Sequence, residues 1–159
     1  MTVTFTLNGQ EKEFEFLPQE TLLDILRKNS LIMQKKGCGK GSCGCCTVLL
    51  NDKPVASCKI PAILAKGNDI VTLEYFKKTN EYADIMKGFK KAGIELCGYC
   101  NAGKIFTTYQ IITSPRLYSK EEVTNQLKNL APCCTDLDTL VNGVLYTLAY
   151  RKKNSKNNN

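Results

Sequence analysis

Cysteine is the residue type through which this chain can do chemistry. The sequence of 159 residues holds nine cysteines and no histidine. Without histidine it has no Ser-His-Asp or Cys-His nucleophile pair, no histidine-bound zinc and no Rieske cluster. A bound metal is therefore expected to be held mainly by thiolates, and no catalytic residue is expected on the chain itself.

Four cysteines of the first half are spaced for one metal cluster. They are Cys38, Cys43, Cys46 and Cys58, in the pattern C-x4-C-x2-C-x11-C. This spacing holds [2Fe–2S] clusters, and the interleaved glycines let a loop wrap closely with its N–H groups aimed at sulfur. We therefore predict a first [2Fe–2S] site here. A zinc knuckle is the alternative, although zinc ribbons favour paired C-x2-C elements.

Four more cysteines lie in the second half, and they are Cys97, Cys100, Cys133 and Cys134. The C-x2-C pair alone is a weak signal, because thioredoxin-like redox motifs share it, but those motifs sit in a βαβ pattern that is absent here. Cys100 and Cys134 each directly precede a predicted helix, so two positive helix N-termini would face one anionic cluster. We predict a second [2Fe–2S] site. The alternative is a disulfide or thiol switch at the C-x2-C pair, beside an unrelated Cys-Cys pair.

The first half has the pattern of strands around one helix. Apolar and polar residues alternate in its first sixteen residues around the turn dipeptide Asn8-Gly9, which predicts a hairpin. Thr21 and Asp24 resemble a capping box before an apolar helical run. Further strands are expected at residues 47–50, near Val55, and at residues 69–75. This order is consistent with a β-grasp domain over residues 1–76.

The second half changes to helical periodicity. Apolar residues recur at helical spacing in four segments, with a plausible stop at Gly93 and a capping box at Ser119 and Glu122. The expected helices include residues 82–89, 105–112, 123–130 and 137–148. We therefore predict a small four-helix bundle over residues 80–150, followed by a disordered tail at residues 151–159. The fold class is α+β.

Charge and hydropathy argue against several classes of partner. The net charge is +7, but the basic residues form no stripe with interleaved aromatic residues, so nucleic-acid binding is not expected. Two clusters with a charge of about −2 each would lower the net charge to about +3. No apolar run approaches the ~20 residues that span a bilayer, and the N-terminus lacks the pattern of a signal peptide. We expect a cytoplasmic protein with no membrane partner.

Taken together, these motifs resemble the small iron–sulfur subunit of the xanthine dehydrogenase/aldehyde oxidoreductase group of molybdenum hydroxylases. The resemblance covers nearly the whole chain. It rests on Thr21-Leu-Leu-Asp-Ile-Leu-Arg27, on Gly37-Cys-Gly-Lys-Gly-Ser-Cys-Gly-Cys-Cys-Thr-Val48, on Ser57-Cys58, and on Cys97-Gly-Tyr-Cys100 followed by Gly103.

The resemblance implies a plant-type ferredoxin-like β-grasp domain and a C-terminal four-helix domain, each with one [2Fe–2S] cluster. It also implies a large molybdopterin-binding subunit, where substrate is hydroxylated, and an FAD-binding subunit. Electrons would pass from molybdenum to the helical-domain cluster, then to the β-grasp cluster and FAD. This chain alone would turn over no substrate.

Several residues depart from the family pattern. Cys45 fits no ligand position and stands where alanine is usual, and Leu96 replaces the glutamine that contacts the pterin. Asn101-Ala102 replaces Thr-Pro, and Pro132-Cys133-Cys134 replaces Cys-Arg-Cys. We expect Cys45 to be a small residue beside the first cluster, with a redox-sensing thiol as the alternative. We expect Cys133 to take over the ligand role that Pro132 cannot fill.

The leading interpretation is an electron-transfer subunit of a molybdenum hydroxylase. A stand-alone ferredoxin-like carrier and a redox sensor with labile clusters are the alternatives. The helical domain argues against a simple carrier, because a ferredoxin needs only the β-grasp half. The sequence of this chain does not identify the substrate, since purines, aldehydes and N-heteroaromatic acids would all be oxidised on another subunit. Purine oxidation is the favoured reading.

Overall fold

The structure of the protein is a computed structural model that describes residues 1–130 and 134–158. Cys133 therefore lies outside the described residues. The strands are β1 (Thr2–Leu7), β2 (Gln10–Glu15), β3 (Thr47–Leu50), β4 (Lys53–Ala56) and β5 (Asp69–Val71). The helices are α1 (Leu22–Lys28), α2 (Leu73–Phe76), α3 (Asn80–Lys91), α4 (Asn101–Thr113), α5 (Lys120–Leu127) and α6 (Leu137–Asn157), with short 3₁₀ turns at Ser57–Lys59 and Ala62–Ala65.

The N-terminal half is the predicted β-grasp domain. Its five strands lie in the order β2-β1-β5-β3-β4, with β1 and β5 parallel and the other neighbours antiparallel. The predicted hairpin joins β1 to β2 through Asn8 and Gly9, whose φ angles of 53° and 80° fit a tight hairpin turn. The predicted capping box starts α1, because Thr21 and Asp24 exchange hydrogen bonds.

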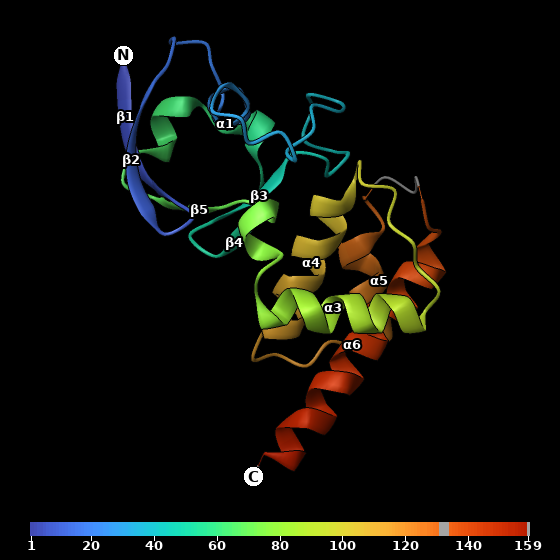
Figure 1. Ribbon diagram of the computed structural model, residues 1–159. Helices are drawn as coiled ribbons and strands as arrows, with labels where there is room; N and C mark the ends of the chain where they lie inside the picture. Colours follow the sequence, from blue (N-terminus) through green and yellow to red (C-terminus); the bar gives the residue numbers. More distant parts are fainter. Residues whose placement is uncertain (131–133, 159) are drawn as a thin grey trace.

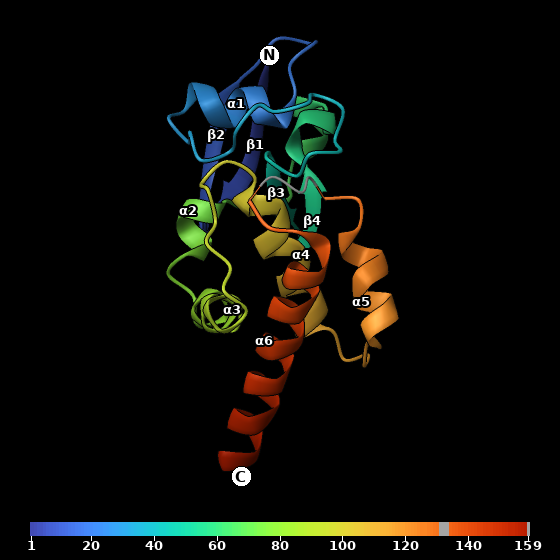
Figure 2. The ribbon, with the colours of Figure 1, turned by 90° about the vertical axis from the view of Figure 1, so that its right-hand side faces the viewer.

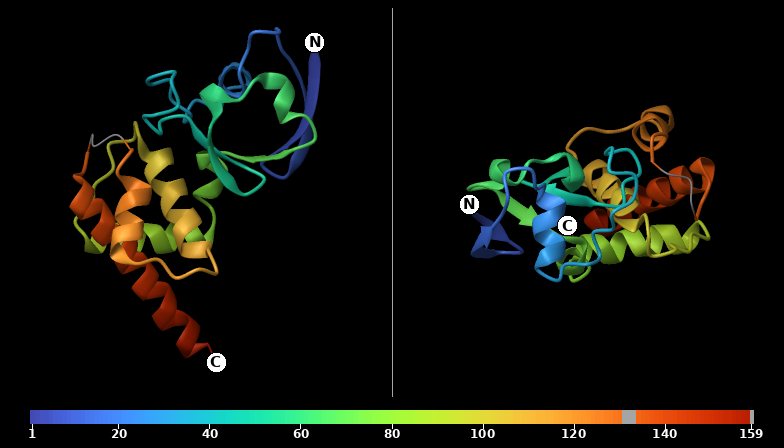
Figure 3. Two further views of the ribbon diagram at one scale, coloured as in Figure 1. Left: turned by 180° about the vertical axis from the view of Figure 1, so that it is seen from behind. Right: turned by 90° about the horizontal axis from the view of Figure 1, so that it is seen from above.

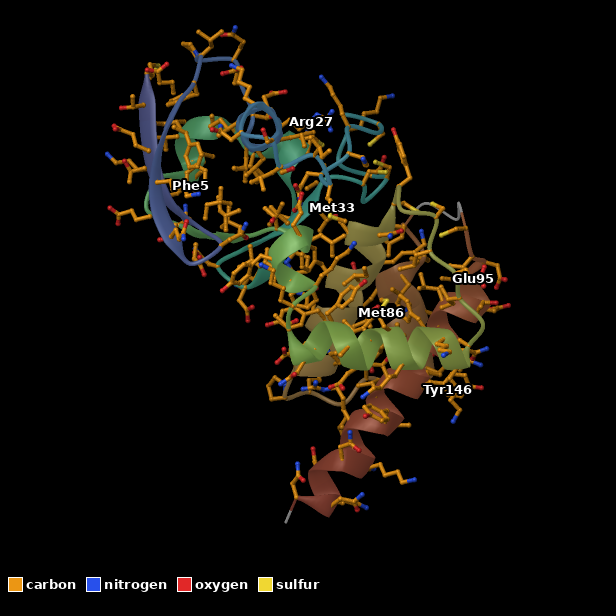
Figure 4. The ribbon with its side chains drawn as sticks, in the orientation of Figure 1. Phe5, Arg27, Met33, Met86, Glu95 and Tyr146 are labelled. Carbon is orange, nitrogen blue, oxygen red and sulfur yellow. The ribbon has the colours of Figure 1, made fainter. Side chains whose placement is uncertain are left out.

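The core of this domain lies between the sheet and α1. The inward residues of β1, including Phe5, and those of α1, including Leu22 and Ile25, belong to one buried cluster. Phe5 stacks on Phe14 across the β1–β2 pair, with ring centroids 4.5 Å apart, and Figure 4 shows Phe5 inside the domain. The alternating pattern of the first strand therefore places its apolar residues where the prediction put them.

The expected strand over residues 69–75 is wrong in its second part. β5 ends at Val71, and residues 73–76 form the short helix α2. The chain turns at Thr72, whose N–H donates to Asn8 Oδ1 at 2.9 Å. Leu73 and Phe76 are then three positions apart on one side of α2, where both are buried in the core of the helical half. Tertiary burial has overridden local β propensity here.

The C-terminal half forms the four predicted helices α3, α4, α5 and α6. The capping box at Ser119 and Glu122 is present at the start of α5, and Gly93 follows α3 with a φ of 76°. Figure 2 shows α3 end-on, lying across α6. The two helices touch at a glycine: a Cβ placed on Gly88 would lie 2.8 Å from the Gly143 carbonyl oxygen. The α+β fold class predicted from the sequence is confirmed.

α6 continues through Asn157, where the sequence led us to expect a disordered tail. The helix runs past residue 150 because no glycine or proline follows Gly143, and the lysines, arginine and alanine there favour helix. Contacts with α3 support its second half: Arg151 Nη1 lies 2.7 Å from Asp84 Oδ2, and Lys87 Nζ lies 2.6 Å from the Tyr150 hydroxyl. Figure 1 shows the last turns projecting beyond the bundle. The predicted boundaries of the two domains, residues 1–76 and 80–150, remain predictions.

The two halves pack against each other through α4. This helix contacts β3 and β4, and Figure 3 shows it facing the sheet. Leu49 of β3 and both buried residues of α2 belong to the core of the helical half. The Tyr109 hydroxyl donates to Asp52 Oδ1 at 2.7 Å, and burial followed by this carboxylate raises the pKa of Tyr109 to about 12. The relative placement of the halves is therefore fixed by packing as well as by the linker.

Within the described residues, no helix is both long and apolar enough to cross a membrane.

Candidate iron–sulfur sites

The first cysteine group lies on the long loop between α1 and β3, with Cys58 in the 3₁₀ turn after β4. The loop bends at Gly39, Gly41 and Gly44, whose φ angles are 65°, 79° and 78°. Side-chained residues rarely adopt these angles. In Figure 4 the yellow sulfur atoms gather on this loop and beside the adjoining end of α4. The glycines between the cysteines thus have the role that the sequence suggested.

The Cys38 sulfur is surrounded by hydrogen-bond donors. Its Sγ accepts from the Lys40 N–H at 3.2 Å, and from both the N–H and the hydroxyl of Ser42 at 3.4 Å. The Ser42 hydroxyl first, and then these N–H groups, lower the pKa of the Cys38 thiol to about 5. A thiolate is the form that binds iron. The loop is therefore shaped to hold a negatively charged sulfur at this position.

Two contacts link cysteines within this first group. The Cys38 N–H donates to Cys43 Sγ at 3.4 Å, and the Cys58 side chain is hydrogen-bonded to that of Cys46. Burial, followed by this contact, raises the pKa of the Cys58 thiol to about 11. No three of the four sulfurs, all of which the structure describes, lie within 4.8 Å of one another. A [2Fe–2S] cluster spreads its four thiolates over two irons, so the ligands of one cluster need not all lie that close together.

Cys45 is buried, with 3% of its surface exposed. Burial, followed by a hydrogen bond to Cys43, raises the pKa of its thiol to about 12. A buried thiol that resists ionisation is a poor redox sensor. The surroundings of Cys45 therefore favour the packing role expected from the sequence.

We predict that Cys45→Ala keeps both clusters, because the ligand set needs none of its atoms. The loss of one buried sulfur should lower the free energy of unfolding by about 1 kcal/mol. Absorbance and EPR spectra of the purified protein measure cluster content. Cys46→Ala is the matched control, and it should lose the first cluster. Loss of that cluster in Cys45→Ala instead would mean that the ligand register is wrong.

The second group gathers at one end of the helical half. The sulfur atoms of Cys97, Cys100 and Cys134 all lie within 4.8 Å of one another. Cys100 is the N-cap of α4, and Cys134 comes shortly before α6. Three of the four cysteines predicted for the second cluster are thus together, and Cys133 lies outside the described residues.

The electrostatic surroundings of this second site suit an anion. The N–H groups of Tyr99 and Cys100 lower the pKa of the Cys97 thiol. Gly98, between Cys97 and Tyr99, has a φ of 82°, so the backbone folds back towards the Cys97 sulfur. The N-terminus of α4 adds its positive end. Thiolate sulfur is a soft ligand that selects zinc, copper(I) or iron–sulfur clusters. Both cysteine groups therefore fit the predicted [2Fe–2S] clusters.

The two sites touch through glycine. A Cβ placed on Gly103, three residues after Cys100, would lie 2.8 Å from Gly44 Cα and 3.0 Å from the Gly44 carbonyl oxygen. Gly44 lies between Cys43 and Cys46 in the first loop. Only residues without side chains allow the two backbones to come this close. Both glycines belong to the sequence motifs, but the sequence alone did not predict that they would contact each other.

Two further residues near the second site bear on its chemistry. Leu96, which stands at the position expected to face the pterin, is half-buried and packs against the core of the helical half. Lys104 is buried, and its Nζ lies 2.8 Å from Cys100 Sγ. Our sequence analysis missed Lys104. The sequence did contain a signal for it, because this lysine stands among the apolar residues of α4, four positions after a predicted ligand.

Comparison with known families divides the chain as the structure does. Residues 5–69 match the family described as 2Fe-2S iron-sulfur cluster binding domain. Residues 72–145 match the family described as [2Fe-2S] binding domain. Each cysteine group thus falls in a separate family match.

Similar proteins share the whole two-part arrangement. The chain is 32% identical over 147 residues to the xanthine dehydrogenase iron-sulfur-binding subunit of Escherichia coli O157:H7, covering 91% of this chain and 92% of that protein. It is 34% identical over 135 residues to the nicotinate dehydrogenase small FeS subunit of Eubacterium barkeri, covering 84% and 86% of the two chains.

Solved structures agree with the sequence relatives. A chain of quinoline 2-oxidoreductase from Pseudomonas putida 86 matches with a TM-score of 0.82 and 29% identity, covering 96% of both chains. The aldehyde oxidoreductase from Desulfovibrio desulfuricans matches with a TM-score of 0.80 and 28% identity. That match covers 96% of this chain but 17% of the longer one.

Proposed function

Since this chain belongs to the family of iron–sulfur subunits of molybdenum hydroxylases, we propose that it relays electrons inside such a complex through two [2Fe–2S] clusters. The contact between the two cysteine sites at Gly44 and Gly103 carries this proposal most directly. It brings two cysteine-rich sites next to each other, as an electron relay requires. The extra helical half would be unnecessary in a carrier with one cluster.

The cysteines of the two groups would hold the clusters. Cys38, Cys43, Cys46 and Cys58 are the proposed ligands of the first, and Cys97, Cys100, Cys133 and Cys134 those of the second. When bound, each cluster accepts and returns one electron at a time. The protein supplies thiolates, N–H donors to sulfur and a shared glycine contact. Buried Cys46 and Cys100 keep part of each site away from water.

The proposed partner subunits supply the donor and the acceptor of the electrons. Substrate is oxidised on a large molybdopterin-binding subunit, and electrons leave through an FAD-binding subunit or another acceptor. The helical-domain site would receive them first and the β-grasp site second. The relatives named for xanthine, nicotinate and aldehyde oxidation differ in substrate. We propose a purine as the substrate class for the complex that contains this chain.

We also propose a cytoplasmic location. The ligand thiols of two clusters must remain reduced until iron is inserted, and the cytosol keeps thiols in that state.

The proposed function predicts about four iron atoms and four sulfides per chain. It also predicts that a large molybdopterin-containing chain accompanies this one on anaerobic affinity purification from its natural host. Metal analysis, sulfide analysis and identification of the co-purified chains are the measurements. As the control, the wild-type chain purified without its partners should show no substrate-dependent turnover. Zinc in place of iron, or an isolated stable monomer from the host, would contradict the proposal.

A further inference from the structure

Lys104 is a buried lysine in contact with a predicted cluster ligand. It lies in the first turns of α4, 1% exposed, and its Nζ lies 2.8 Å from Cys100 Sγ. The two residues are four positions apart, and helical side chains lean towards the helix N-terminus. The helix itself thus delivers the ammonium group to the sulfur. Of the described lysines, Lys104 alone is buried.

This position is unfavourable for a cation unless an anion is bound nearby. Lysine is almost never fully buried without a charged or polar partner, because an ammonium group loses its hydration. The first turn of a helix also favours negative charge, since its unpaired N–H groups carry partial positive charge. Lys104 is nevertheless buried near such a helix start, and Cys100 Sγ is one of the groups that its ammonium contacts. Residues that break local rules in this way are expected at functional sites.

A cavity lies beside Lys104. Lys104 lines this space of about 180 Å³ together with Leu127, Leu137 and Leu140. Thr135 also lines it, so its wall is of mixed polarity. Lys128 lines the same cavity, but this second lysine is exposed. The cavity therefore holds one buried and one solvated lysine.

We propose that Lys104 tunes and positions the second cluster by donating a hydrogen bond to the Cys100 sulfur and raising the reduction potential of that cluster. The inference rests on the proposed function. When the clusters are bound, one electron would arrive at the second cluster from the molybdopterin-binding subunit and would leave to the first cluster. Reduction adds one negative charge, so a nearby positive charge stabilises the reduced cluster more than the oxidised one.

The test is a redox titration of the purified complex, followed by the separate EPR signals of the two clusters. Lys104→Met removes the charge and keeps most of the volume. We expect the equilibrium constant for reduction of the second cluster to fall about tenfold, which is a shift of about 59 mV for one electron. The first cluster should not change. Lys128→Met is the matched control from the same cavity, and neither cluster should shift in it.

A second pair of variants covers the case in which Lys104→Met fails to assemble its cluster. Lys104→Arg keeps the charge and should keep the potential, whereas Lys104→Gln should lower it. An unchanged potential in Lys104→Met or Lys104→Gln overturns the inference. Loss of the second cluster in all three variants, arginine included, also overturns it, because Lys104 would then act through packing alone. Absence of the second signal in the wild-type complex would instead sink the proposed function.

Discussion

Cys134→Ala is expected to lower the iron content from about four to about two atoms per chain. The sulfur of Cys134 lies with those of Cys97 and Cys100 within 4.8 Å of one another, so its loss removes one ligand from a compact set. A [2Fe–2S] cluster with three thiolates should not survive purification. The EPR signal of the first cluster should remain, because its ligands lie on another loop. Iron analysis and low-temperature EPR of the reduced protein measure both effects.

Cys133→Ala extends this test to the cysteine that directly precedes Cys134. We predict the same fall to about two iron atoms, since Pro132 cannot serve as a ligand and a turn can bring adjacent cysteines to one cluster. The Cys45→Ala variant is the common control, with four iron atoms expected. Unchanged EPR signals of both clusters in Cys133→Ala would show that another group completes the site.

Much of the positioning of the cysteines could be predicted because it depends on local signals. Hairpin and capping residues such as Asn8-Gly9 and Thr21 form their structures through contacts within a few residues. The helical periodicity of the second half similarly places Cys100 at the start of α4. Spacing alone indicated which cysteines belong together. The sulfur distances of the second group agree with that grouping for its three described members.

What could not be predicted depends on contacts between distant segments. The segment after Val71 has strand-forming residues, yet it forms α2 because Leu73 and Phe76 are buried against the helical half. The end of α6 looked like a polar tail, but Asp84 and Lys87 of α3 contact it from 63 or more positions away in sequence. The burial of Lys104 likewise depends on helices α5 and α6.

Gly103→Ala is expected to slow electron transfer between the two clusters and to destabilise the contact between the two halves. The new Cβ would lie 2.8 Å from Gly44 Cα, which is backbone and cannot rotate away. The first cluster loop must therefore shift from α4. Overpacking of this kind costs about 1–3 kcal/mol. Stopped-flow measurement of the reduction of each cluster, after mixing the complex with substrate, reports the rate of transfer.

Thr113→Ala is the control for this change, since Thr113 is exposed on the same helix α4, at its far end from Gly103. It should leave the free energy of unfolding within about 0.5 kcal/mol and the transfer rate unchanged. Iron content must stay at about four in both variants, so that a slower rate reports the distance between clusters and not their loss. An unchanged rate in Gly103→Ala, with both clusters present, would show that electrons do not pass through the Gly44–Gly103 contact.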